Sequence, residues 1–276
     1  MPSPKSPPAK KDELLQLRID KALLDRLSGL AEESHLPLSV MLRSWLTERL
    51  SVEDKRVDAE REEWVESRLA SIKARLPLFD DGPLLVTHGY SLAPNKKLDL
   101  DYIQSRSSSL LLNSRGATGQ INQFGFSITK KLDNGRILSE GQAFKVGRVE
   151  SIYSIPVENH QILGKALDHA IVEIIQSLSV FFQNSENCLP LVFKVALLAV
   201  ENYSIVVNPT TMSSPPSTFS SSEVFLSDVL ITSFEQIASE TTTAEHMIDV
   251  IDELWHAAGQ RHSLSFDDKK KWLKRR

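Results

Sequence analysis

Two side chains that can recognise DNA bases stand in residues 13–20, ELLQLRID. Apolar and polar residues alternate there, and this period of two predicts a β-strand with one buried face. The buried positions would be Leu15, Leu17 and Ile19. The alternation turns Leu14, Gln16 and Arg18 to the opposite face. In the major groove, glutamine pairs bidentately with adenine and arginine with guanine, so these residue types suit the reading of a DNA sequence.

Other chemically capable residues form no recognised catalytic set. The sequence has no GxSxG elbow, HExxH motif, Walker-type loop or Rossmann fingerprint. Some acidic pairs and histidines could hold a metal, although solvated turns and a helix end explain them more simply: Asp99 with Asp101, Asp267 with Asp268, and His256 with His262. We therefore expect no enzymatic activity, no cofactor and no metal. A nuclease or other enzyme in the C-terminal half is the least favoured alternative.

Glycines and tryptophans near these residues have structural interpretations. The segment Gly116-Ala-Thr-Gly119 is short for a phosphate cradle and favours a loop, and Gly259 is expected to cap a helix end. Trp255 stands at helical spacing from Ile251, which favours a core position. The final residues, KKKWLKRR, are strongly basic. Trp272 could stack on nucleic acid there, although a solubilising tail is the commoner explanation.

Composition limits the class of protein. The chain has 276 residues, 41% of them hydrophobic, and a formal net charge of −4, so it is no globally basic nucleic-acid binder. Its one cysteine, Cys188, cannot form an intrachain disulfide. No apolar run reaches the roughly 18 residues of a membrane span. We expect a soluble cytoplasmic protein with no membrane partner.

Two amphipathic helices are expected after the strand. The first carries apolar residues at three- and four-residue steps, from Leu23 to Ala31, and Pro37 opens the second. A lone short strand has no partner for its backbone groups. The economical solution is a homodimer in which two strands pair antiparallel and four helices enclose one core. The alternative is an ordinary edge strand of one larger domain.

The strand-helix-helix order of residues 13–50 resembles the ribbon-helix-helix family. The resemblance implies that Leu14, Gln16 and Arg18 contact bases, although Leu14 departs from the usual polar residue. It also implies that the start of the second helix, at Leu38 and Ser39, contacts a phosphate through backbone N–H groups. Lys10 and Lys11, in a basic arm over residues 1–11, would add further phosphate contacts.

A charged segment, residues 52–76, follows the second helix. Val65, Leu69, Ile72 and Leu76 form a narrow apolar seam on it, which predicts either a solvated linker helix or a short dimeric coiled coil. The prolines of residues 77–83 mark a domain boundary.

The remaining chain predicts a mixed α+β sheet domain over residues 83–273, before a basic end at 274–276. Strands are expected at 84–92, 109–114, 125–132 and 136–155, and two more within 189–208. The DNG sequence at 133–135 predicts a hairpin turn. Helices are expected at 162–183 and 244–258. The first of these has a buried stripe of Leu167, Ile171, Ile174, Ile175 and Leu178.

Several pieces of this half resemble the α+β domain found C-terminal to Schlafen-type AlbA-like domains in bacterial proteins. They are GPLLVTHGYSL, NQFGFSI, GQAFKVGRVESI and LWHAAGQRHSLSFDDKKKWL. The resemblance implies an architecture and an association with nucleic acid, but no particular activity.

The expected fold is therefore α+β, with a ribbon-helix-helix unit at residues 12–51, a charged linker helix and a C-terminal sheet domain. The leading hypothesis is a homodimeric, sequence-specific binder of double-stranded DNA that regulates transcription, with higher-order assembly on DNA as a further option. Residues 83–273 would sense a ligand or contact a protein partner. The alternative is a dimeric scaffold whose N-terminal unit only dimerises.

Overall fold

The computed structural model describes residues 21–34, 37–93, 97–183, 188–206 and 217–273. The chain divides into two compact units, Met1–Ser67 and Arg68–Arg276. The expected arm at 1–11, the expected strand at 13–20 and the basic end at 274–276 lie outside the described residues. Within the described ranges, none of the helices combines the length and hydropathy that a bilayer crossing requires.

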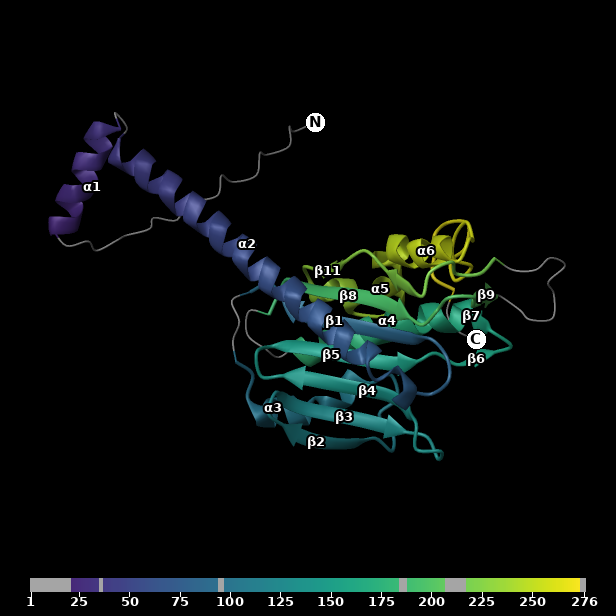
Figure 1. Cartoon of the computed structure of the whole chain (residues 1–276). Helices are drawn as coiled ribbons and strands as arrows, with labels where there is room; N and C mark the ends of the chain where they lie inside the picture. Colours follow the sequence, from purple (N-terminus) through teal and green to yellow (C-terminus); the bar gives the residue numbers. More distant parts are fainter. Residues whose placement is uncertain (1–20, 35–36, 94–96, 184–187, 207–216, 274–276) are drawn as a thin grey trace, which may run out of the picture. The chain divides into compact units, whose positions relative to one another are not determined.

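Two helices account for the described part of the N-terminal unit (Figure 1). Helix α1 spans Lys21–Glu33, which confirms the helix expected from the apolar steps. Helix α2 begins at Leu38, directly after Pro37, and ends at Lys73. The expected unit boundary at Ser51 does not interrupt the helix, because one continuous helix covers both segments. The reason is that no glycine or proline interrupts residues 38–76, and Pro77 is the first residue unable to continue the helix.

The C-terminal unit is built on a sheet of eight strands among the described residues, all paired antiparallel (Figure 1). The strands are β1 (Leu84–Ser91), β2 (Thr118–Asn122), β3 (Gly125–Lys131), β4 (Ile137–Phe144), β5 (Arg148–Ser154), β8 (Leu191–Leu198), β10 (Glu223–Phe225) and β11 (Val229–Ile231). Their order is β10-β8-β1-β5-β4-β3-β2, and β11 also pairs with β8. A smaller sheet joins β6 (Val157–Glu158), β7 (Gln161–Leu163) and β9 (Ser204–Val206). The mixed α+β class is therefore confirmed.

Helix α4 (Gly164–Phe182) packs its apolar stripe into the main core against one face of the large sheet. The five stripe residues expected from the sequence are all buried. The other helical elements of this unit are η1 (Leu76–Leu78), α3 (Leu100–Ser105), η2 (Ser107–Leu110), η3 (Phe234–Ile237), α5 (Glu240–His246) and α6 (Ile248–Ala257). The 133–135 turn is confirmed, because it joins β3 to β4 and Gly135 has a φ of 84°.

Two expected elements are wrong. Residues 109–114 do not form a strand, because the chain makes the 3-10 turn η2 and then a loop. A run of three leucines has no alternation, so it fits a buried turn as well as a strand. The helix expected at 244–258 is two helices that meet at Met247. Ser239 starts the first of them earlier, through a capping box with Thr242.

The end of α2 and the opposite face of the sheet are joined by ion pairs. Three basic residues contact carboxylates on three different strands: Arg68 with Glu150, Lys73 with Glu223, and Arg75 with Glu140. Ile72 and Phe79, which are close in sequence to these basic residues, are fully buried. The C-terminal unit therefore begins inside α2, earlier than the boundary expected at residues 77–83.

Candidate functional site

The expected DNA-contacting side chains of the strand and arm lie outside the described residues. They are Leu14, Gln16 and Arg18 on the strand, and Lys10 and Lys11 on the arm. Their roles stay predictions.

The start of α2 is described, and it offers backbone donors. The N–H groups of Val40 and Met41 both donate to the carbonyl of Pro37, at 2.9 and 3.1 Å. Leu38 and Ser39 precede them at the first turn, where a helix leaves N–H groups without an intrahelical acceptor. Ser39 is exposed and Leu38 half-buried. This position has the donors that a phosphate contact requires.

Large apolar side chains on α1 and α2 are exposed, and we call them the exposed apolar set. Their exposed fractions run from 41% at Leu24 to 52% at Val52. The set consists of Leu23, Leu24, Leu30, Val40, Trp45, Leu46 and Val52. Single exposed apolar residues are ordinary on a protein surface. Several lie on two consecutive helices, where Ala31 and Met41 are among the buried apolar residues. Together they form an apolar surface that the described residues leave exposed.

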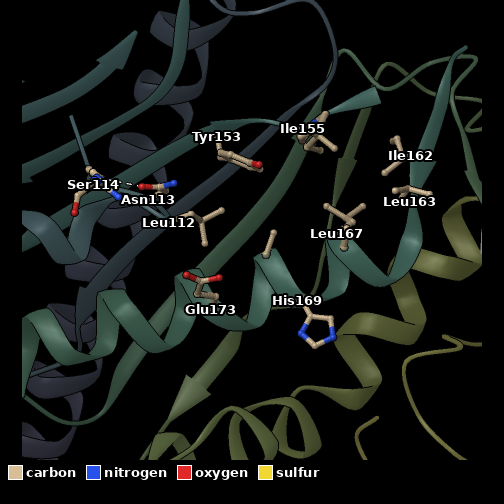
Figure 2. A pocket seen from close by; sticks show the side chains of 14 residues that line it. Leu112, Asn113, Ser114, Tyr153, Ile155, Ile162, Leu163, Leu167, His169 and Glu173 are labelled. Carbon is tan, nitrogen blue, oxygen red and sulfur yellow. Dashed lines mark hydrogen bonds between the residues drawn. The ribbon is translucent and has the colours of Figure 1, made fainter. Parts of the chain in front are cut away.

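A cavity of about 680 Å³ opens in the C-terminal unit. One wall is the first half of α4, and the others are the end of β5 with the following residues, strand β7 and the segment 112–115. The lining is mainly apolar (Figure 2). Its polar members are Asn113, Ser114, Arg115, Tyr153, His169 and Glu173. This is the size and lining of a small-molecule site.

An ionic cluster with a buried centre lies on the face of the sheet opposite α4. His88 on β1 lies in register between Glu150 on β5 and Lys194 on β8. The Nε2 atom of His88 is 3.0 Å from an oxygen of Glu150, whose carboxylate also receives two hydrogen bonds from Arg68, at 2.7 and 2.9 Å. Lys194 donates to Asp228 at 2.9 and 3.0 Å. His88 and Glu150 are each only 1% exposed.

The charge state of Glu150 follows from these neighbours. Burial alone would raise the pKa of its carboxyl, but hydrogen bonds and charges from His88 and Arg68 outweigh burial and hold the pKa at about 2. The carboxylate is therefore ionised and fully engaged. Since Glu150 is closed to solvent, the cluster stabilises the packing of α2 on the sheet and offers no surface to a substrate.

A second buried carboxylate, Asp168 on α4, joins α4 to the chain after α6. It accepts hydrogen bonds from the Nε1–H of Trp255 at 3.0 Å, from Ser263 Oγ at 2.7 Å and from Ser265 Oγ at 2.6 Å. Burial raises its pKa to about 6, while these three donors lower it in part. Trp255 is confirmed as a core residue, at 1% exposure.

The neighbouring residue, His169, joins α4 to α5 and to the end of the described chain. Its Nδ1 atom lies 2.6 Å from an oxygen of Glu240, which also accepts a bond from the indole of Trp272. Trp272 is 6% exposed and its ring packs against His169 and Phe266. The less favoured alternative, in which Trp272 stacks on nucleic acid, is therefore wrong, because the ring is already buried against His169 and Phe266.

The remaining sequence candidates do not converge. Gly259 is confirmed as a helix cap, with a φ of 75° and its N–H donating to His256. Asp267 accepts bonds from the backbone N–H groups of Lys269 and Lys271, as in a turn. The described residues bring together no group of three or more His, Cys, Asp or Glu that could hold a metal.

Sequence reasoning missed the cavity and both buried carboxylate clusters. One signal was present for the ionic cluster, because Lys194 interrupts an otherwise apolar strand. The meeting of Lys194 with His88 and Glu150 depends on strand register, which the sequence does not show.

A scan against protein-family models, a search of curated proteins and a search of solved structures each found no match to this chain.

Proposed function

We propose that this chain is a homodimeric, sequence-specific DNA-binding protein that regulates transcription. The observation that carries the proposal is the exposed apolar set on α1 and α2, the two helices that directly follow the expected base-reading strand. A second copy would cover this set and would also pair with the strand.

Dimerisation has a clear driving force in this unit. Complete burial of a leucine or valine side chain contributes about 1.5–3 kcal/mol, and each member of the exposed apolar set is about half exposed. Two antiparallel copies of residues 13–20 would satisfy each other's backbone groups, while the four helices enclose the apolar residues between them.

DNA contact would use the outer face of the paired strands. Gln16 and Arg18 would read bases in the major groove. Lys10 and Lys11, with the backbone N–H groups at Leu38 and Ser39, would hold phosphates. Residues 1–76 carry 14 basic and 14 acidic side chains, so affinity depends on local placement and would weaken steeply with salt.

The remaining features of the proposal rest on the two resemblances. The likeness of residues 83–273 to a domain of bacterial proteins associated with nucleic acid supports a DNA-linked role. It also favours the cytoplasm of a bacterial cell as the location. Further assembly of dimers on neighbouring half-sites belongs to the same proposal.

Site selection from random duplexes, followed by mobility shift on the selected duplex, tests the proposal. We expect a palindromic site, and Arg18→Ala should lose about 1–3 kcal/mol of binding free energy, the worth of one bidentate base contact. Arg26→Ala removes the same charge from an exposed position of α1 and should change affinity far less. Full affinity of Arg18→Ala for the selected duplex would overturn the base-reading role.

A second candidate is a dimeric scaffold, which the exposed apolar set favours equally. Sedimentation with and without duplex DNA separates the two functions. Both require a dimer, but only the regulator requires the dimer to bind DNA. A dimer that ignores every duplex at low salt would support the scaffold. A monomer at micromolar concentration would contradict both proposals.

A further inference from the structure

The cavity beside α4 has one polar and one apolar end. Figure 2 shows Asn113, Ser114 and Glu173 toward one end, and Ile162 and Leu163 toward the other. Ile155, Ile162 and Leu167 are 3%, 0% and 2% exposed, so the apolar end is continuous with the protein core. A polar end and an apolar end on one cavity suit a molecule with the same division.

Hydrogen bonds from other elements hold the cavity wall formed by α4 in place. Asp168 and His169, the two residues after Leu167, are held by hydrogen bonds to Trp255 and Glu240. Gly164 lets Trp255 approach closely, because a Cβ at Gly164 would lie 2.5 Å from the indole. The cavity is therefore largely preformed, which lowers the ordering cost of binding.

The charges at the polar end balance. Arg115 supplies one positive charge and Glu173 one negative charge, while Asn113 and Ser114 are neutral. A strongly charged head would meet attraction from one of these groups and repulsion from the other. An uncharged or zwitterionic head that both donates and accepts hydrogen bonds meets no such repulsion.

We propose that this cavity binds a small amphipathic molecule with an apolar body and an uncharged or zwitterionic head. The body lies against Ile155, Ile162 and Leu167, and the head faces Asn113, Ser114 and Glu173. The proposal does not depend on DNA binding, since all of the lining residues belong to the C-terminal unit.

Two fluorescent probes with a common ring system test the proposal on the full chain. N-phenyl-1-naphthylamine is uncharged and offers one N–H, whereas 8-anilinonaphthalene-1-sulfonate adds a negative charge. We expect saturable binding of the uncharged probe, with about tenfold or greater preference over the sulfonate, which corresponds to about 1.4 kcal/mol.

Cavity-filling variants locate the probe. Ala166→Trp and Ala170→Trp each place an indole in the cavity from half-buried positions on α4. Each folded variant should weaken binding of the uncharged probe by about tenfold or more. Ala70→Trp makes the same change at an exposed site of α2 in the same unit and should leave binding unchanged. Circular dichroism verifies folding, and two filling variants provide a second chance should one fail to fold.

Three outcomes would overturn the proposal. They are no saturable binding by the wild-type chain, unchanged binding in a folded filling variant, and tighter binding of the sulfonate at the same cavity. Mobility shift with the selected duplex is run in parallel. Loss of probe binding with intact DNA binding then isolates the cavity, and the reverse result isolates the proposed DNA contact.

Discussion

Acid is expected to lower the free energy of unfolding because it protonates the buried carboxylate of Glu150. Its carboxyl has a pKa of about 2, against an ordinary value of 4.5, because His88 and Arg68 overcome the effect of burial. A depressed pKa means that folding favours the ionised form. The stabilisation is therefore complete above about pH 4.5 and is lost as the pH falls toward 2.

The magnitude follows from the same two values. Each pH unit between them corresponds to about 1.4 kcal/mol, so the carboxylate contributes about 3 kcal/mol at neutral pH. Glu150→Gln keeps the shape of the side chain but cannot ionise. The variant should be less stable than the wild type by up to this amount at neutral pH, and the difference should shrink in acid.

Urea unfolding followed by circular dichroism measures the difference, at about pH 7 and at steps down to about pH 3. The difference between the two proteins cancels the titration of the other groups that they share. Glu201→Gln, at an exposed position, is the matched control and should track the wild type throughout. A gap between wild type and Glu150→Gln that stays constant from neutral to acid pH would refute the reasoning.

Two further predictions concern the supports of α4. Ser265→Ala removes a hydroxyl that lies 2.6 Å from Asp168 and should cost about 1.5–3 kcal/mol when that carboxylate is ionised. Since burial raises the pKa of Asp168 to about 6, urea unfolding should show the larger loss at about pH 8 than at about pH 5, and equal losses would contradict the assignment. Gly164→Ala drives a Cβ to 2.5 Å from Trp255 and 2.6 Å from Ile205, so it should cost about 1–3 kcal/mol and lower the Tm. Gly29→Ala, in helix α1 where a Cβ meets no atom within 4 Å, should hold or raise the Tm, and equal effects of the two changes would count against the packing argument.

Local signals in the sequence predicted the elements that depend on local physics. Three local patterns each favour one backbone conformation, and the structure has that conformation in each case. They are the apolar steps of residues 167–178, the DNG turn and the glycine at 259. The leucines of residues 110–112 favour no single conformation, because apolar side chains without alternation fit several buried conformations. Burial of Leu110 and Leu111 was predictable, but the 3-10 turn was not.

The candidate sites depended on contacts between distant residues and were harder to predict. Glu150 meets Arg68 across 82 positions of sequence, and Ser265 meets Asp168 across 97. The expected polar and aromatic candidates at the C-terminus were chosen by composition, which could not show that Trp272 is buried. The cavity requires the relative placement of β5, β7 and α4, and no single segment encodes that placement.

The contacts at the end of α2 decide where this protein can be cut. A fragment that starts at the prolines of residues 77–83 would lose Arg68 and leave Glu150 without its guanidinium partner in the middle of a sheet. A start at Pro77 would also remove the buried Ile72, and a start at Pro83 would remove the buried Phe79 as well. Anyone who prepares the C-terminal half alone should therefore keep the helical residues from Arg68 onward, since by its contacts this stretch serves as part of the sheet domain.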